Sequence, residues 1–161
     1  MDLFVLMLAI PLVSGLLLTV VGERAWAPNL NIIASAGTFL ASALLTVEIV
    51  AAGPRFAFGE LFFIDSLNVF FVALTAFVGL TTSIFSNPYM RNEQEHGKLT
   101  MPRLRLYKSM FQLFMFTMLA ALTTNNLGIL WVAMEAATLT TVLLVSLYRT
   151  PASLEAAWKY F

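Results

Sequence analysis

The chain is 161 residues long, with 60% hydrophobic residues, 11% charged residues and a formal net charge of zero. A soluble domain is about half apolar and about a quarter charged, so this composition excludes an ordinary soluble protein. The apolar residues form long uninterrupted runs, which predict an all-α integral membrane protein.

The sequence also limits the chemistry that the chain can perform. It contains no cysteine and one histidine, which excludes cysteine ligation of an iron–sulfur cluster and bis-histidine ligation of a haem. It carries neither a GxGxxG nor a GxxxxGK[ST] phosphate-binding loop. We therefore expect no cofactor, no catalytic centre and no nucleic-acid binding in this chain, and we expect any electron transfer to occur in a partner protein.

A first membrane helix is predicted over residues 3–21. It is preceded by Asp2 rather than by a positively charged segment, and its apolar run is longer than that of a signal peptide, so we interpret it as a retained helix. Pro11 is expected to bend it, while Ser14 and Gly15 present a small surface to a neighbouring helix.

A second helix is predicted over residues 30–52. Four of its hydroxyl side chains recur at helical spacing, which favours close helix contact and hydrogen bonds. Glu48, in its last turn, is expected to face headgroup water. The four hydroxyl residues are Ser35, Thr38, Ser42 and Thr46.

The third helix is predicted over residues 62–86, after a turn-rich connection in which residues 55–58 can form a short extended segment. Asp65 lies in its first turn, where the helix dipole stabilises an acid, so a capping role is favoured over a functional one. Asn87–Pro88 is predicted to end this helix, because proline removes a donor and clashes with the preceding turn.

A long polar loop is predicted to follow, and then a fourth helix over residues 107–122. The tight turn of residues 123–126, Thr-Thr-Asn-Asn, offers an N-cap for a fifth helix over residues 126–147. Thr150–Pro151 is typical of the start of another helix. The prediction is therefore five transmembrane helices and the beginning of a sixth.

The positive charges are unevenly distributed over this topology. With the N-terminus outside, the inner segments hold eight of the nine Lys and Arg residues and the outer segments hold only Arg55. We therefore expect an N-terminus facing the periplasm or exterior and a cytoplasmic C-terminal end, in a bacterial or archaeal cell membrane. The eight are Arg24, Arg91, Lys98, Arg103, Arg105, Lys108, Arg149 and Lys159.

Glu135 is the main candidate functional residue, because it is the only charged residue in the predicted fifth helix and lies near its middle. Insertion of a charged side chain at the centre of a membrane helix costs roughly 2.5–3.5 kcal/mol, and such residues are usually functional. Burial favours the neutral acid, whereas a nearby cation favours the carboxylate. Glu135 is accordingly predicted to be a proton site; the alternative is a permanently protonated acid that hydrogen-bonds across a helix interface.

Helical spacing places two candidate accessory residues, Trp131 and Thr138, on the face of Glu135, and Asp65 is a third possible accessory residue. Lys159 has two interpretations, a lysine that snorkels to the interface or a member of a proton path.

Three stretches carry a resemblance to a family. FFIDSLNVFFVALTAFVGLTTSIFSNPYM is similar to the third helix of that family, where an acid precedes a small residue, a leucine and a polar residue. NNLGILWVAMEAATLTTVLLVSLY is similar to the fifth helix, with an aromatic residue four positions before a glutamate, and TPASLEAAWKYF is similar to the linker into helix six. The chain thus resembles the antiporter-like membrane subunits of respiratory complex I, multisubunit sodium/proton antiporters and energy-converting hydrogenases, and the last two stretches resemble the hydrogenase-4 component F type.

The resemblance implies a fold of about fourteen helices with two inverted five-helix repeats. It implies that Glu135 is the helix-five carboxylate, which in the family pairs with a lysine on helix seven to gate proton passage. Lys159 matches a family lysine at the entrance of helix six. Residues 1–106 would form an N-terminal region with three helices, and residues 107–161 would begin the first proton-translocation repeat. Because the sequence ends at Phe161, before helix seven, we expect it to be a fragment, with a second polypeptide completing the repeat as the alternative.

The function expected from the residues and the resemblance is that of a membrane subunit in a proton-translocating oxidoreductase complex. The expected partners are other membrane subunits, the lipid bilayer and, indirectly, peripheral redox subunits. Two alternatives remain open, a subunit of a multisubunit cation/proton antiporter and a structural membrane subunit that does not pump.

Overall fold

The computed structural model describes residues 2–160; Met1 and Phe161, the last residue of the TPASLEAAWKYF stretch, lie outside the described residues. Five long helices account for most of the chain. They are joined by one β-hairpin and followed by a short sixth helix. In chain order the elements are α1 (Leu3–Val21), α2 (Ala27–Ala52), β1 (Arg55–Ala57), β2 (Phe62–Ile64), α3 (Ser66–Glu95), α4 (Met101–Thr123), α5 (Leu127–Val145), the 3₁₀ turn η1 (Ser146–Tyr148) and α6 (Pro151–Tyr160).

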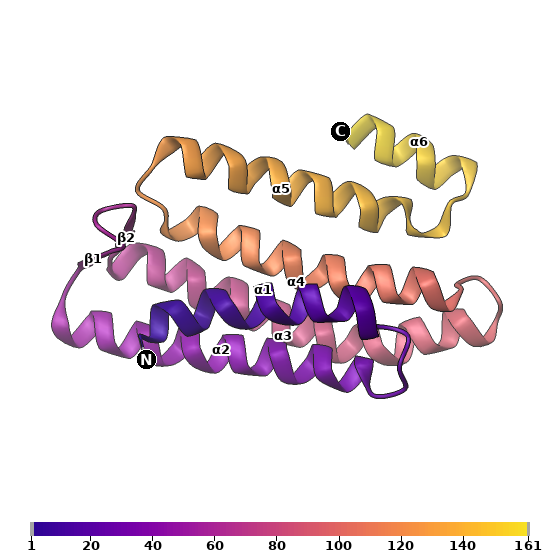
Figure 1. Ribbon diagram of the computed structural model, residues 1–161, viewed down its shortest axis with the longest axis horizontal. Coiled ribbons are helices and arrows are strands. Elements are labelled where there is room, and N and C mark those ends of the chain that lie inside the picture. The colour runs from indigo at the N-terminus through magenta and orange to yellow at the C-terminus, as the bar shows by residue number, and fades with distance from the viewer. Residues whose placement is uncertain (1, 161) are drawn as a thin grey trace.

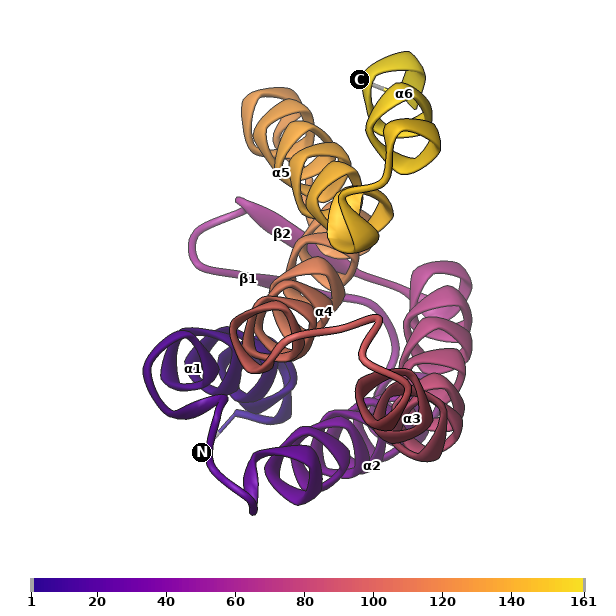
Figure 2. The same ribbon diagram turned by 90° about the vertical axis from the view of Figure 1, so that its right-hand side faces the viewer.

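The first four long helices form a bundle, and α5 and α6 lie on one side of it (Figures 1 and 2). The most extensive contacts join α1 to α4, α2 to α3, α4 to α5 and α1 to α2. The sixth helix turns back beside α5 (Figures 1 and 2). Five helices are long and apolar enough to cross a membrane, so the predicted all-α membrane class is confirmed.

A two-stranded antiparallel hairpin closes one end of the bundle. Its register pairs Arg55 with Ile64 and Ala57 with Phe62. The backbone N–H of Asn125 donates to the carbonyl of Leu61 at 2.8 Å, so the hairpin is joined to the α4–α5 turn. Residues 62–64, predicted as the start of the third helix, are therefore a strand, and the helix begins at Ser66.

The third helix is also longer at its other end than predicted. It continues through Pro88 to Glu95, so the prediction that Asn87–Pro88 ends it was wrong. Proline removes only one helical donor, and the glutamate, glutamine and arginine residues that follow it favour the helical state. Glu93 is buried and accepts a hydrogen bond from Lys98 Nζ at 3.0 Å, which ties the last turn to the next loop.

The fourth helix begins at Met101, six residues before the predicted start, so the long polar loop is reduced to residues 96–100. Pro102 lies in the first turn of α4. A proline is tolerated there because its missing N–H would have no helical partner at that position. The amphipathic residues that follow, which were interpreted as loop, extend α4 toward the ends of α1 and α3.

Side-chain caps define the starts of three spanning helices. Asp65 accepts from the N–H groups of Leu67 and Asn68, and the Asn68 side chain accepts from the N–H of Asp65, which completes a capping box. Asn126 accepts from the first turn of α5 in the same way. The predicted capping role of Asp65 is confirmed, the cap expected from the turn of residues 123–126 is Asn126, and Asp2 also caps α1.

Glycine allows α1 and α4 to approach closely. A β-carbon at Gly15 would lie 3.0 Å from Leu113 Cγ and 3.2 Å from the Leu113 backbone nitrogen. At this contact, Ser109 Oγ donates to the Gly15 carbonyl at 2.9 Å. The predicted small surface at residues 14 and 15 is therefore the contact with α4, and small residues of this kind let membrane helices pack through their backbones.

We expect Gly15→Ala to lower the free energy of unfolding relative to Gly37→Ala by about 1–2 kcal/mol, because the added methyl overpacks the α1–α4 contact. Gly37 is a matched control, since a β-carbon there would meet Ile10 Cδ1 at an ordinary distance of 3.5 Å. Both changes raise helix propensity equally, so their difference isolates the contact. Thermal unfolding in detergent micelles measures it, and equal stability of the two variants would contradict the close packing.

Candidate functional site

The candidate site is the face of α5 that carries Glu135. The opposite face of α5 packs on the bundle through the buried residues Ala133, Ala137 and Thr140. Glu135 is two positions from each alanine, and two residues advance a helix by about 200°, so its side chain points away from that contact. It is exposed, and it makes no hydrogen bond or ion pair with any side chain among residues 2–160.

The two accessory candidates lie beside Glu135 on α5. Trp131, one turn earlier, is 69% exposed. Thr138, one turn later, donates its hydroxyl to the Met134 carbonyl at 3.1 Å, so that its hydrogen is used within the helix. The three side chains form a strip that α4 does not cover. A lone carboxyl on such a strip can bind a proton and can pair with a cation on a segment that covers it.

Lys159 lies near the end of α6, and its Nζ is 2.6 Å from Glu155 Oε1. The two residues are one helical turn apart and both are exposed, which is the geometry of an ordinary surface pair. The described part of the chain therefore does not join Lys159 to Glu135. Asp65 is likewise occupied as a cap, on the helix that begins after the hairpin.

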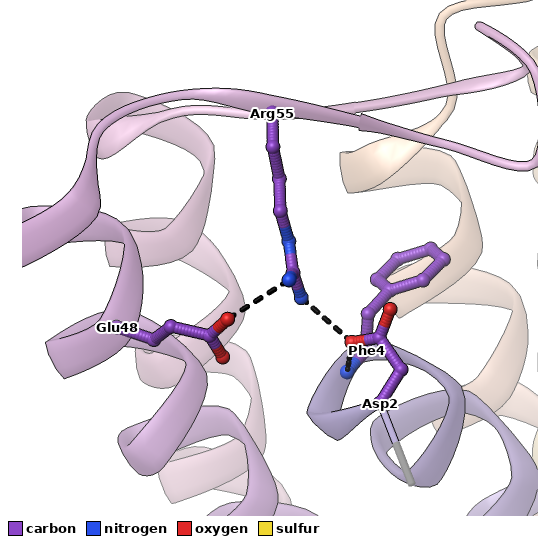
Figure 3. Close-up of polar contacts among 4 residues, drawn as sticks. All are labelled: Asp2, Phe4, Glu48 and Arg55. Atoms are coloured by element: carbon purple, nitrogen blue, oxygen red, sulfur yellow. Dashed lines mark hydrogen bonds and ion pairs between the residues drawn. The ribbon is translucent and has the colours of Figure 1, made fainter.

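The sequence did not predict an ionic cluster at the hairpin end of the bundle. Arg55 lies between two acids, with Nη2 2.6 Å from Asp2 Oδ1 and Nη1 2.8 Å from Glu48 Oε1 (Figure 3). It thereby connects the start of α1, the last turns of α2 and strand β1. The expectation that Glu48 simply faces headgroup water is incomplete, since its carboxylate also binds Arg55. The sequence did contain a signal for this cluster. Arg55 is the one cation predicted on the outer side of the membrane, and several acidic residues are predicted on the same side.

Buried polar contacts also join α2 and α4. Gln112, fully buried on α4, places Nε2 2.9 Å from both Asn31 Oδ1 and Ser35 Oγ. Lys108, one turn earlier, is buried as well and donates to the carbonyl of Gly22, which ends α1, at 2.9 Å. Lys108 therefore acts as a cationic cap at the end of α1.

Three of the four residues in the predicted hydroxyl stripe of α2 are buried, and Thr46 is half-buried. Thr46 makes the expected kind of contact between helices, since its Oγ1 donates to the Val69 carbonyl of α3 at 3.4 Å. The other three mainly bond within α2. Ser35, Thr38 and Ser42 each donate to the carbonyl four residues earlier in α2. Of these, only Ser35 also accepts from another helix, through Gln112. The stripe mainly reduces the bulk of the α2 surface, which small polar residues in membrane helices commonly do.

No cluster of three or more His, Cys, Asp or Glu side chains that could hold a metal ion occurs within residues 2–160. The fold and the site therefore define a class of protein, a multi-pass helical membrane protein with a lone carboxyl on an uncovered face of a spanning helix.

Comparisons with known proteins find two relatives that are similar to part of the chain. A hydrogenase-4 component F homolog of Methylacidiphilum infernorum is 52% identical to the chain over 103 residues, which make up 64% of the chain and 22% of that protein. A protein of Staphylococcus saprophyticus that carries the name antiporter subunit mnhA2 is 31% identical over 84 residues, which make up 52% of the chain and 10% of that protein. No family model matches the chain. The chain is thus similar to a hydrogenase-4 component F homolog and to an antiporter subunit, and it matches less than a quarter of the length of either.

We expect Arg55→Gln to lower the free energy of unfolding by about 0.5–1 kcal/mol at low salt, because it removes a partly exposed pair of ionic contacts. The loss should shrink in high salt, since exposed charges are screened. Thermal unfolding in detergent at two salt concentrations measures it. Arg24→Gln is the control, because Arg24 is exposed and forms no ion pair in the described part of the chain. An equal loss in both variants would contradict a specific role for the cluster.

Proposed function

We propose that the chain forms part of a membrane subunit of a proton-translocating oxidoreductase complex, of the type to which hydrogenase-4 and NADH:quinone oxidoreductase belong, and that Glu135 is a carboxylate of its proton path. The observation that carries the proposal is that Glu135 is the only charged residue of α5 and lies on the face that the bundle leaves uncovered. The similarity to the component F homolog supports the kind of complex.

In this proposal Glu135 alternates between its protonated and ionised forms. A cationic partner within about 4–6 Å favours the carboxylate, and withdrawal of that partner favours uptake of a proton. The uncovered position of Glu135 on α5 leaves room for a partner on another segment. Lys159 is proposed as an accessory residue at the entrance to the path, because it is the cation of the helix that turns back beside α5. Trp131 and Thr138 would shape the surroundings of the acid, and Asp65 remains a capping residue.

The proposed partners are other membrane subunits of a hydrogenase or complex I-like assembly, with peripheral redox subunits supplying the driving reaction. Within this scheme, residues 1–106 form the N-terminal membrane region and residues 107–161 begin the first translocation repeat.

A cation/proton antiporter subunit is the second candidate function, and the similarity to the antiporter subunit mnhA2 favours it. In that case the same carboxylate would exchange ions without a redox partner. A structural subunit, in which Glu135 only donates a hydrogen bond, is the third.

We also propose that the end of the bundle opposite the hairpin faces the cytoplasm of a bacterial or archaeal cell. The turns at that end hold Arg24, Lys98 and Arg149, and the helix ends beside them hold Arg91 and Arg103. Arg55 is the cation of the hairpin end, where it is bound by two acids. Positively charged segments are retained on the cytoplasmic side during insertion, which supports this orientation.

Glu135→Gln in the complete complex is expected to leave assembly intact and to reduce proton translocation by roughly 100-fold, because glutamine cannot exchange a proton. Translocation is measured as acidification of vesicles driven by the redox reaction. Glu60→Gln, an exposed hairpin acid, is the matched control and should pump normally.

Normal pumping by Glu135→Gln would favour the structural alternative, since glutamine can still donate a hydrogen bond. Ion exchange that requires Glu135 in vesicles with no electron donor would favour the antiporter alternative.

A reporter inserted at Gly97, between α3 and α4, is expected to behave as cytoplasmic, because eight of the nine cations are assigned to that side. A reporter at Gly59, in the hairpin loop, serves as the control and should behave as periplasmic. The opposite pattern would reverse the proposed orientation.

A further inference from the structure

A crevice of about 490 Å³ opens between α1 and the start of α4, next to the turn that joins α5 to α6. Three arginines line it, Arg103 and Arg105 from α4 and Arg149 from the turn. We propose that this crevice binds the phosphate headgroup of an anionic phospholipid.

The arginines are held in place while most of their donors stay free. Arg103 Nη1 donates to the Tyr148 carbonyl at 3.2 Å, which fixes Arg103 beside Arg149 across 46 residues of sequence. Arg105 Nη1 lies 3.0 Å from Glu23 Oε1. Each guanidinium has five N–H donors, so each keeps several for a phosphate. The Arg149 side chain makes no hydrogen bond or ion pair within residues 2–160.

The side chains that line the crevice carry an excess of positive charge, which favours the binding of an anion. Three arginines line the crevice, and Glu23 forms an ion pair with only one of them, Arg105. Arginine presents a planar pair of donors that matches two oxygens of a phosphate. The hydroxyl group of Thr100 adds a neutral donor at the edge of the same crevice, whereas that of Thr19 donates to the Leu16 carbonyl at 2.6 Å.

The rest of the lining favours a lipid over a free anion. Leu106 and Met110 continue the crevice along α4 toward the apolar part of the spanning helix. The lining residues come from the last turn of α1, the first turns of α4 and the turn after α5. These segments lie at the same end of the bundle (Figure 1), where a membrane helix meets the headgroup layer. A phosphate held by the arginines would therefore have its acyl chains beside an apolar wall, the usual arrangement of basic lipid sites between membrane helices.

Arg149 has a backbone conformation that is unusual for an arginine. Its φ of 52° and ψ of 29° lie in the left-handed region, which glycine or asparagine adopts at lower energy. Residues kept in that region cluster at ligand-binding positions. Here the strained turn places a charged side chain on the crevice.

The test titrates the full-length protein in detergent with phosphatidylglycerol and counts bound lipid by native mass spectrometry. Wild-type protein should retain one phosphatidylglycerol more tightly than phosphatidylcholine. Arg103→Gln combined with Arg149→Gln should weaken retention about 25-fold, since each arginine near an anionic lipid contributes about 1 kcal/mol, or about fivefold. Arg149→Gln alone should weaken it about fivefold, and its fold should be intact because that side chain has no partner to lose.

Arg91→Gln is the matched control, because Arg91 is exposed at the same end of the bundle but lines a different crevice. It should bind phosphatidylglycerol as the wild type does. Unchanged retention in the Arg149→Gln variant, or an equal loss in Arg91→Gln, would overturn the proposal. Full displacement of the lipid by inorganic phosphate would also overturn it, by showing a site for a free anion. The measurement involves no proton transport, so its outcome is independent of the role proposed for Glu135.

Discussion

The contact between α1 and α4 is the interaction on which the arrangement of the other elements depends. The backbones approach at Gly15, and Ser109 and Lys108 donate into carbonyl groups of α1. In a membrane the hydrophobic effect does not bring helices together, so close packing and hydrogen bonds of this kind hold them. Because α4 also contacts α2, α3 and α5, its position on α1 sets where the carboxyl of α5 lies relative to the bundle.

Some polar side chains of this protein form hydrogen bonds or ion pairs within the bundle, and others do not. The caps, the Asp2–Arg55–Glu48 cluster and the contacts of Gln112 satisfy most polar groups at both ends and between helices. Such contacts stabilise a membrane bundle because an unpaired polar group in an apolar surrounding is costly. Glu135 and Arg149 are among the ionisable side chains that make no hydrogen bond or ion pair within residues 2–160, and their positions distinguish them, since Glu135 lies on the uncovered face of a spanning helix and Arg149 lines a crevice. These two positions carry the proposals for function.

The two proposed sites differ in what would occupy them. The strip around Glu135 is flanked by exposed apolar side chains such as Trp131 and Leu139, so a covering segment must be largely apolar and carry a cation. The crevice at Arg149 has the reverse requirement, an anion with an apolar extension. Separate elements hold these sites, one on the outer face of α5 and one between α1 and α4.

The sequence by itself determined the class of protein, the five spanning helices, the cap at Asp65, a capping turn before the fifth helix and the position of Glu135 as the one charged residue of that helix. These follow from local properties, namely apolar runs, capping chemistry and the cost of a charge in a membrane helix. The continuation of α3 past Pro88 and the early start of α4 could not be predicted, because proline positions only bias a helix end. The tertiary structure alone decided that Arg55 binds two acids 7 and 53 residues away, and that Lys108 is buried. It also decided that Arg103 meets the turn at Arg149, since contacts between distant segments depend on helix packing that no local pattern encodes.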